Sequence, residues 1–244
     1  MGLLEATVEE IRDALEGFDR WSEGGDRPDQ YALDQVTDAG ALSVLRAAGV
    51  RVLSEESGLS EGDSSEVVIL DPVDGSTNAS RRIPHYCTSL CVVDSEGPAV
   101  GLVVNLATGE RFEAVRGAGA RRDGQAIEPT HCDDLSAAIV GIAGWPSEPL
   151  PVAQFRSFGA CALDLSAVAC GRLDGYVDPI AHHGVWDYAA GVLICREAGA
   201  DVGEIMDREL FHLDHGRRLG PVAGSTEALR VSLAAAANGR PDSS

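Results

Sequence analysis

Two apolar segments that each end in acids constrain this chain more than any other feature. VRVLSEES (residues 50–57) and EVVILDPVDG (residues 66–75) both have the pattern of a buried strand that stops at carboxylates. Four acids, Glu55, Glu56, Asp71 and Asp74, therefore stand beside buried apolar runs. Like charges in such a place repel one another, so the fold needs a partner that makes them stable together.

The rest of the chain mixes helix and strand patterns. Helical spacing covers residues 3–18 and 31–49, and Gly49 is placed as a C-cap. Residues 88–124 have the apolar runs and turn residues of a β-meander, and from about residue 131 strand and helix patterns alternate. No repeat of fixed period is present.

Composition excludes several classes of function. The chain has 244 residues, 44% of them hydrophobic, which is enough for one large domain or two fused lobes. A net charge of −20 argues against nucleic-acid partners and anionic membranes. The N-terminal segment carries acids where a signal peptide needs basic residues, and no run of eighteen apolar residues occurs, so we expect a cytoplasmic protein.

The basic residues and cysteines narrow the chemistry further. All 19 basic residues are arginine, so Schiff-base lysines and the P-loop lysine are excluded. Six cysteines are scattered without any CxxC pair, which favours buried free thiols over a zinc site. Anions must therefore be bound by arginine, by backbone N–H groups or by metal ions.

The acidic segment fails two familiar patterns. Counted from Asp71, the third, fifth and twelfth positions of a calcium-binding EF-hand loop would be Val73, Gly75 and Arg82, which are the wrong residues. Phosphatases that form an aspartyl-phosphate use two aspartates separated by one residue and an essential lysine. Here Asp74 follows Asp71 by three positions, and the chain has no lysine.

A site for hard divalent cations fits the segment better. Mg²⁺ binds carboxylate oxygens and turns their mutual repulsion into stabilisation. Pro72 restricts the backbone between Asp71 and Asp74, so that both acids can face one point at the end of a strand. Gly75 and Ser76 then offer backbone N–H groups at the start of an expected helix, where a phosphate group is favoured.

Three motifs in this order resemble the signatures of the inositol monophosphatase family, within the lithium-sensitive, magnesium-dependent phosphatase superfamily. They are SEES, DPVDGSTN and WDYAAGVLICREAGA. The resemblance extends to YALDQVTDA (31–39), to residues 156–178 and to PVAGSTEAL (221–229), so it spans nearly the whole chain.

The resemblance implies a single phosphatase domain over residues 1–244, folded as a layered αβαβα sandwich of the sugar-phosphatase type. Residues 1–133 would form an N-terminal α+β lobe with an antiparallel sheet, and residues 134–244 a C-terminal α/β lobe, with the site between them. By the same resemblance the protein would be a homodimer.

The family's functional residues map onto this sequence one by one. Two or three Mg²⁺ ions per site would be held by Glu56, Asp71, the backbone carbonyl of Val73, Asp74 and Asp187. Phosphate would bind at Gly75 and Ser76, and the attacking water would be activated by Ser76 and Asp34. Substrate contacts would come from Ala160, Cys161 and Asp178.

The resemblance implies Mg²⁺-dependent hydrolysis of a small phosphate monoester, such as inositol monophosphate or a related sugar or polyol phosphate. Alternatives are fructose 1,6-bisphosphate, histidinol phosphate and 3′-phosphoadenosine nucleotides, or a non-catalytic protein that binds a phosphorylated metabolite. The segment PIAHHGVWD is two residues longer than in relatives that act on inositol phosphate, so the substrate stays open. The roles of His182, His183, Arg81 and Arg82 are open as well.

Overall fold

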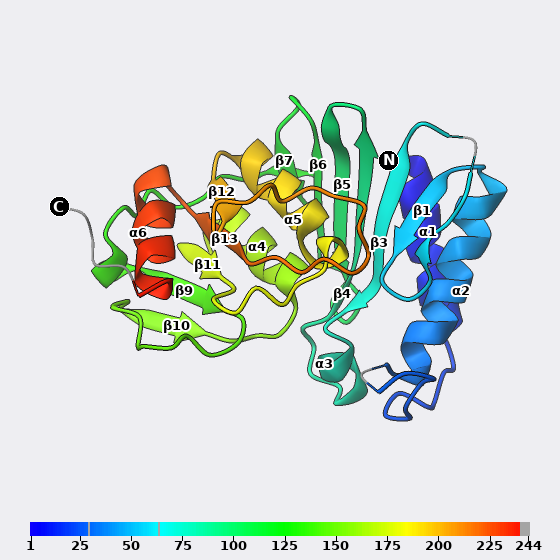
Figure 1. Cartoon of the computed structure of the whole chain (residues 1–244). Coiled ribbons are helices and arrows are strands. Elements are labelled where there is room, and N and C mark those ends of the chain that lie inside the picture. The colour runs from blue at the N-terminus through cyan, green and yellow to red at the C-terminus, as the bar shows by residue number, and fades with distance from the viewer. Residues whose placement is uncertain (29, 63, 240–244) are drawn as a thin grey trace.

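The computed structural model describes residues 1–28, 30–62 and 64–239. Its helices and sheets alternate in five layers, from α1 and α2 on one side to α6 on the other (Figure 1). The predicted αβαβα sandwich is confirmed. Among the described residues, no helix is both long and apolar enough to span a membrane.

The first two layers are a helix pair and a large sheet. α1 (Gly2–Leu15) and α2 (Ala32–Ala47) pack on one face through an apolar cluster that includes Ile11, Leu45 and Leu90. The eight strands have the spatial order β2-β1-β3-β4-β5-β6-β7-β8. Their bounds are β1 (Arg51–Ser54), β2 (Gly58–Leu59), β3 (Val67–Asp74), β4 (Cys87–Asp94), β5 (Gly97–Asn105), β6 (Arg111–Val115), β7 (Ala120–Arg122) and β8 (Gln125–Ala126).

One strand pair departs from the predicted antiparallel sheet. β1 and β3 run parallel, with Ser54 opposite Leu70, whereas all other neighbours in the large sheet are antiparallel. The chain reverses into the short strand β2, which pairs antiparallel with β1, before it enters β3. The carboxyl ends of β1 and β3 therefore meet at the same edge of the sheet.

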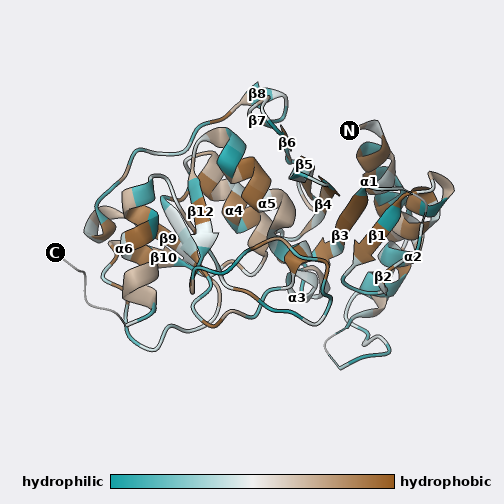
Figure 2. Cartoon of the chain, turned by 45° about the horizontal axis from the view of Figure 1, so that its top comes forward, coloured by the Kyte–Doolittle hydropathy of each residue, from teal (hydrophilic) through white to brown (hydrophobic). Residues whose placement is uncertain are grey.

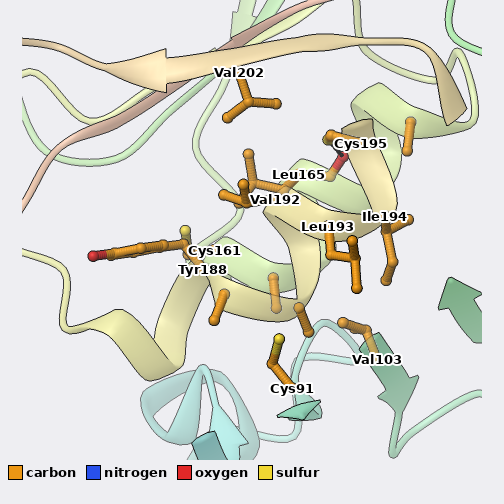
Figure 3. Packing of buried hydrophobic residues seen from close by; sticks show 14 of the residues in the cluster. Cys91, Val103, Cys161, Leu165, Tyr188, Val192, Leu193, Ile194, Cys195 and Val202 are labelled. Carbon is orange, nitrogen blue, oxygen red and sulfur yellow. Dashed lines mark hydrogen bonds between the residues drawn. The ribbon is translucent and has the colours of Figure 1, made fainter. Parts of the chain in front are cut away.

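The central layer consists of α4 (Cys161–Ala169) and α5 (Val185–Ala198). Figure 3 shows side chains of α5 between Val202 of β12 on one side and Cys91 and Val103 of the large sheet on the other. Both helices are hydrophobic around most of their surface because they are covered from two sides, and Figure 2 shows this concentration of apolar residues at the centre.

The fourth and fifth layers are a small sheet and α6 (Glu227–Ala237), whose Leu229 and Leu233 pack against it. The strand order is β10-β9-β11-β13-β12, with parallel pairs at β10-β9-β11 and antiparallel pairs at β11-β13-β12. The bounds are β9 (Ile139–Ile142), β10 (Gln154–Arg156), β11 (Gly175–Val177), β12 (Asp201–Glu204) and β13 (Pro221–Gly224), and a 3₁₀ turn (Leu135–Ala137) precedes them.

The six cysteines are all free thiols, as the sequence predicted. Four of them are buried, and Cys132 and Cys170 are half-buried. The thiols are thus mostly part of the apolar core.

Candidate active site

Three carboxylates from distant parts of the chain meet where α5 packs against β3. Glu55 follows β1, Asp71 lies in β3 and Asp187 lies in the first turn of α5. One oxygen from each of the three lies within 4.8 Å of the others. The parallel pairing of β1 with β3 places Glu55 next to Asp71, and α5 brings Asp187 against the same edge.

Asp71 is the buried centre of this cluster. Its side chain is 1% exposed, Oδ1 accepts a hydrogen bond from the Val73 backbone N–H at 3.0 Å, and Oδ2 has no hydrogen-bond partner. Burial, and then the charge of Glu55, raise the pKa of Asp71 well above its ordinary value. A buried carboxylate oxygen without a donor is costly. None of the described residues donates a hydrogen bond to this oxygen, and a cation would be a suitable partner for it.

The donor set fits a hard divalent cation. Every group in the cluster is a carboxylate, and carboxylate oxygens are what Mg²⁺ prefers over nitrogen and sulfur ligands. Burial and the neighbouring Asp187 also raise the pKa of Glu55. A bound cation would relieve both the repulsion and the orphaned oxygen of Asp71.

The structure places Glu55 in the cluster where the sequence predicted Glu56. The Glu56 carboxylate instead contacts the Arg27 guanidinium and the Gln30 side-chain amide, and it is absent from the group formed by Glu55 and Asp71. The two glutamates are adjacent in the turn that follows β1, and their side chains have different partners. The glutamate of the carboxylate cluster is therefore Glu55 and not Glu56, and the binding of a metal ion by either stays a prediction.

Asp74 lies beside the cluster and is bound to α4. In a regular strand, residues three apart face opposite sides, but the pairing of β3 with β4 shifts register between Asp71 and Asp74. Both Asp74 oxygens accept backbone N–H groups at the start of α4, from Cys161 at 3.2 Å and Ala162 at 2.7 Å. Burial and the charge of Asp187 raise the pKa of Asp74 to about 7. Its predicted role as a metal ligand stays a prediction.

Gly75 makes the turn out of β3 possible. Its φ is +86°, and an added Cβ would lie 3.0 Å from the Gly159 carbonyl oxygen and 3.1 Å from the Ala160 side chain. Ser76 then begins the short helix α3 (Ser76–Ser80). Both Gly75 and Ser76 are half-buried, and their predicted contact with phosphate stays a prediction.

Asp34 lies in the first turn of α2, close to the same region. Its carboxylate accepts the Tyr31 backbone N–H at 2.8 Å, and the Tyr31 hydroxyl lies 3.4 Å from the Thr77 hydroxyl of α3. Burial and the nearby Glu56 raise the pKa of Asp34 to about 7. The structure thus brings together the helices that carry Asp34 and Ser76, and their joint action on a water stays a prediction.

Two of the predicted substrate contacts are buried at the start of α4. The side chains of Ala160 and Cys161 are 1% and 2% exposed. Ala160 packs close to Gly75, and the backbone N–H of Cys161 binds Asp74. These two residues therefore support the turn at Gly75 and the carboxylate of Asp74. Contact of their side chains with substrate stays a prediction.

The third predicted substrate contact, Asp178, is not supported. Its side chain is fully buried, and its oxygens accept the backbone N–H groups of Ile180, Ala181 and His182 at 3.1, 3.1 and 2.9 Å. The His182 ring nitrogen Nδ1 lies 3.0 Å from the same carboxylate. Both oxygens accept hydrogen bonds from the acid's own loop and the side chain is fully buried, so a contact of Asp178 with substrate stays a prediction.

A cavity of 240 Å³ opens beside the cluster, and sequence reasoning missed part of its wall. Glu55 and Trp186 line it together with His215 and Arg218, and with Arg27 from the segment before α2. The Nε2 of His215 lies 2.8 Å from the Glu55 carbonyl oxygen, and its ring lies 4.7 Å from that of Trp186. Two larger cavities, of 360 and 320 Å³, contain none of the three clustered carboxylates.

The arginines left open by the sequence lie apart from the carboxylates. The Arg82 guanidinium stands 3.9 Å from the centre of the Trp21 ring, so its charge packs on an aromatic face. Arg81 ends α3 as its C-cap. Neither residue lines the cavity beside the cluster.

Comparison with known proteins agrees with this geometry. The model of the inositol monophosphatase family matches residues 5–240. The chain belongs to the inositol monophosphatase family. A fructose-1,6-bisphosphatase/inositol-1-monophosphatase of Archaeoglobus fulgidus is 38% identical over 210 residues, covering 83% of this chain and 81% of the relative. The Nus factor SuhB of Escherichia coli is 30% identical over 251 residues, covering 96% and 90%.

Solved structures place the fold in the same family. A Pyrococcus horikoshii protein described as similar to inositol-1-monophosphatase superposes with a TM-score of 0.85 at 25% identity, covering 96% of this chain and 95% of the other. An inositol monophosphatase from Anabaena superposes with a TM-score of 0.78 at 25% identity, covering 98% and 96%. Membership of the inositol monophosphatase family indicates that this protein is a phosphatase.

Proposed function

We propose that this protein is a Mg²⁺-dependent phosphatase that hydrolyses a small phosphate monoester, such as inositol monophosphate or a related sugar or polyol phosphate. The observation that carries the proposal is the buried, unpartnered Oδ2 of Asp71, within a cluster completed by Glu55 and Asp187. Such an arrangement is unfavourable without a cation and well suited to bind one.

Glu55, Asp71 and Asp187 would hold the metal, with Asp74 and the Val73 carbonyl as further ligands for two or three ions. Mg²⁺ bound there would supply an acidic water and would neutralise phosphate oxygens. The chain's own contribution is to hold these acids in a largely buried place, where electrostatic interactions are strong.

Proton transfer and phosphate binding would fall to the elements around the cluster. Asp34 has a pKa raised by burial to about 7, which suits a group that accepts a proton near neutral pH. The Ser76 hydroxyl would orient the water with it. The backbone N–H groups of Gly75 and Ser76 would hold the phosphate, since the φ of +86° at Gly75 turns the chain at that point.

Two features support a small substrate. The cavity that reaches Glu55 has a volume of 240 Å³, at the lower end for ligand pockets. The Archaeoglobus relative is named for both fructose-1,6-bisphosphatase and inositol-1-monophosphatase activity, so a sugar bisphosphate belongs among the substrates to be tested. Histidinol phosphate and 3′-phosphoadenosine nucleotides complete the panel of substrates to be tested.

We also propose that the protein is a homodimer in solution, which sedimentation velocity would test.

The deciding experiment measures inorganic phosphate released from this panel with Mg²⁺ and with EDTA. We expect release from at least one monoester with Mg²⁺, and its loss with EDTA or in Glu55→Gln. A protein that binds these esters and releases no phosphate from any of them is a binding protein, and the proposed function is then wrong. Glu56→Gln is the matched comparison, because Glu56 lines the same cavity but lies outside the cluster, so it separates the loss of a clustered carboxylate from the loss of a cavity charge.

A further inference from the structure

His183 stands immediately before α5 and close to a proposed metal ligand. Its Nδ1 lies 3.3 Å from Oδ2 of Asp187, and its Nε2 lies 2.9 Å from the Tyr176 hydroxyl. The side chain is only 12% exposed. The largely buried imidazole therefore has a polar neighbour at each ring nitrogen, the carboxylate at Nδ1 and the phenol at Nε2, unlike a histidine in a solvent-exposed loop.

The backbone around His183 is fixed as well. His183 and Leu219 exchange two backbone hydrogen bonds, of 3.2 and 2.9 Å, in an isolated bridge. The preceding residues are fastened by Asp178, which accepts three backbone N–H groups of the same loop. The ring also packs on that of His182, with centroids 4.2 Å apart. The imidazole is thus presented to Asp187 from a rigid support.

The two oxygens of Asp187 then have different tasks. Oδ2 accepts the Gly184 backbone N–H at 2.7 Å and is also the oxygen nearest to Nδ1 of His183. This leaves Oδ1 as the oxygen available to a cation shared with Glu55 and Asp71. A carboxylate that is held through one oxygen cannot rotate away when the cluster is charged.

We infer that His183 is a positioning residue of the metal site, which donates from Nδ1 to Asp187 and orients that carboxylate toward the metal. The inference rests on the proposed function. A Tyr176 hydroxyl that donates to Nε2 leaves the proton of the neutral ring on Nδ1, which is the tautomer that Asp187 requires. Outer-shell partners of this kind typically change metal affinity by about 10- to 100-fold when they are removed.

The test compares three substitutions by the Mg²⁺ affinity of the substrate-free protein, measured by isothermal titration calorimetry. The amide N–H of His183→Asn takes the place of Nδ1, whereas the amide of His183→Gln takes the place of Nε2. We expect His183→Gln and His183→Ala to weaken Mg²⁺ binding by about 10- to 100-fold, and His183→Asn to stay within about threefold of the wild type.

Two further variants separate positioning from general damage. His182→Asn keeps an amide N–H in the place of the Nδ1 that contacts Asp178 and removes only the ring that packs on His183, so Mg²⁺ affinity should stay within about threefold of the wild type. Tyr176→Phe removes the hydroxyl that sets the tautomer and should weaken Mg²⁺ binding several-fold. Circular dichroism confirms that each variant is folded.

The outcomes are distinct for the two proposals. The positioning role is overturned if every His183 variant binds Mg²⁺ as tightly as the wild type, or if His183→Asn and His183→Gln lose the same amount of Mg²⁺ affinity. Neither result contradicts the phosphatase proposal. A wild type that binds Mg²⁺ but cleaves no phosphate ester contradicts the phosphatase proposal, and the affinity series still reports on His183. A wild type that binds no Mg²⁺ overturns both.

Discussion

Removal of divalent metal should make the stability of this protein fall steeply as pH rises. Asp71, Asp74 and Glu55 are crowded with Asp187, and in the folded chain without metal all three have pKa values raised by burial and by the charges of neighbouring acids. In the unfolded chain these carboxyls return to ordinary pKa values. The folded state therefore binds more protons than the unfolded state across the acidic to neutral range.

The size of the expected change in stability follows from Asp74, whose pKa is about 7 in the folded chain against 3.8 as its ordinary value. Because the folded pKa is raised, the stabilisation is complete below pH 3.8 and is lost as the pH passes through 7. Between about pH 5 and pH 8, this one group lowers the free energy of unfolding by about 2.5 kcal/mol. For a chain of this size, that corresponds to a drop in Tm of about 5 to 10 °C.

The assay is thermal and urea unfolding after EDTA treatment and dialysis, from about pH 5 to pH 8, with and without Mg²⁺. We expect the metal-free protein to lose stability toward pH 8. Mg²⁺ should restore it most strongly there, by about 2.7 kcal/mol at a hundredfold excess over Kd. Asp34→Asn is a useful companion, because it removes a second carboxyl with a pKa of about 7 and should flatten the profile.

A metal-free protein that is as stable at pH 8 as at pH 5 would refute this reasoning. It would mean that the clustered carboxylates are not in electrostatic conflict in the folded state. Equal stabilisation by Mg²⁺ at both pH values would also contradict it, since the cation would then not compete with protons for these oxygens.

Three other predictions concern single residues. Glu55→Gln should lower kcat/KM by at least about 100-fold, roughly 2.7 kcal/mol, and Glu56→Gln by less than about tenfold, in steady-state phosphate release. Gly75→Ala should lower the free energy of unfolding by about 1–3 kcal/mol in urea, because of its φ of +86° and the Gly159 carbonyl; an unchanged midpoint would contradict this. Asp178→Ala should lower the free energy of unfolding in urea by about 1–3 kcal/mol, because it orphans three backbone N–H groups; a variant as stable as the wild type would rule this out.

Much of the fold could be predicted from the sequence because its signals are local or come from ordered motifs. The helical spacing of residues 3–18 and 31–49 matches α1 (Gly2–Leu15) and α2 (Ala32–Ala47) to within a few residues. The resemblance to the inositol monophosphatase family supplied the order of layers. The parallel pairing of β1 and β3 within a mainly antiparallel sheet was missed, because the direction of a strand within a sheet leaves no local pattern in the sequence.

The site was predicted in part. Asp71 and Asp187, 116 positions apart, do converge, and the motifs that carry them were recognised. The sequence could not choose between Glu55 and Glu56 as the member of the cluster, because SEES reads alike for either residue and the direction of a side chain after a strand is decided by the turn that follows. The sequence also could not show that Asp178 binds its own loop, because an acid that does so and an acid that faces a ligand look alike in a sequence.

The amino-acid order alone determined the layered αβαβα architecture, the family and the supply of acids at the ends of apolar strands. Only the tertiary structure decided which carboxylate oxygens come together, which are already satisfied by backbone N–H groups, and that His183 lies beside Asp187. The physical reason is that charge and hydropathy are properties of residues, whereas coordination requires atoms of separate segments at distances of a few ångströms, which are set only when α5 packs against β3 and β4.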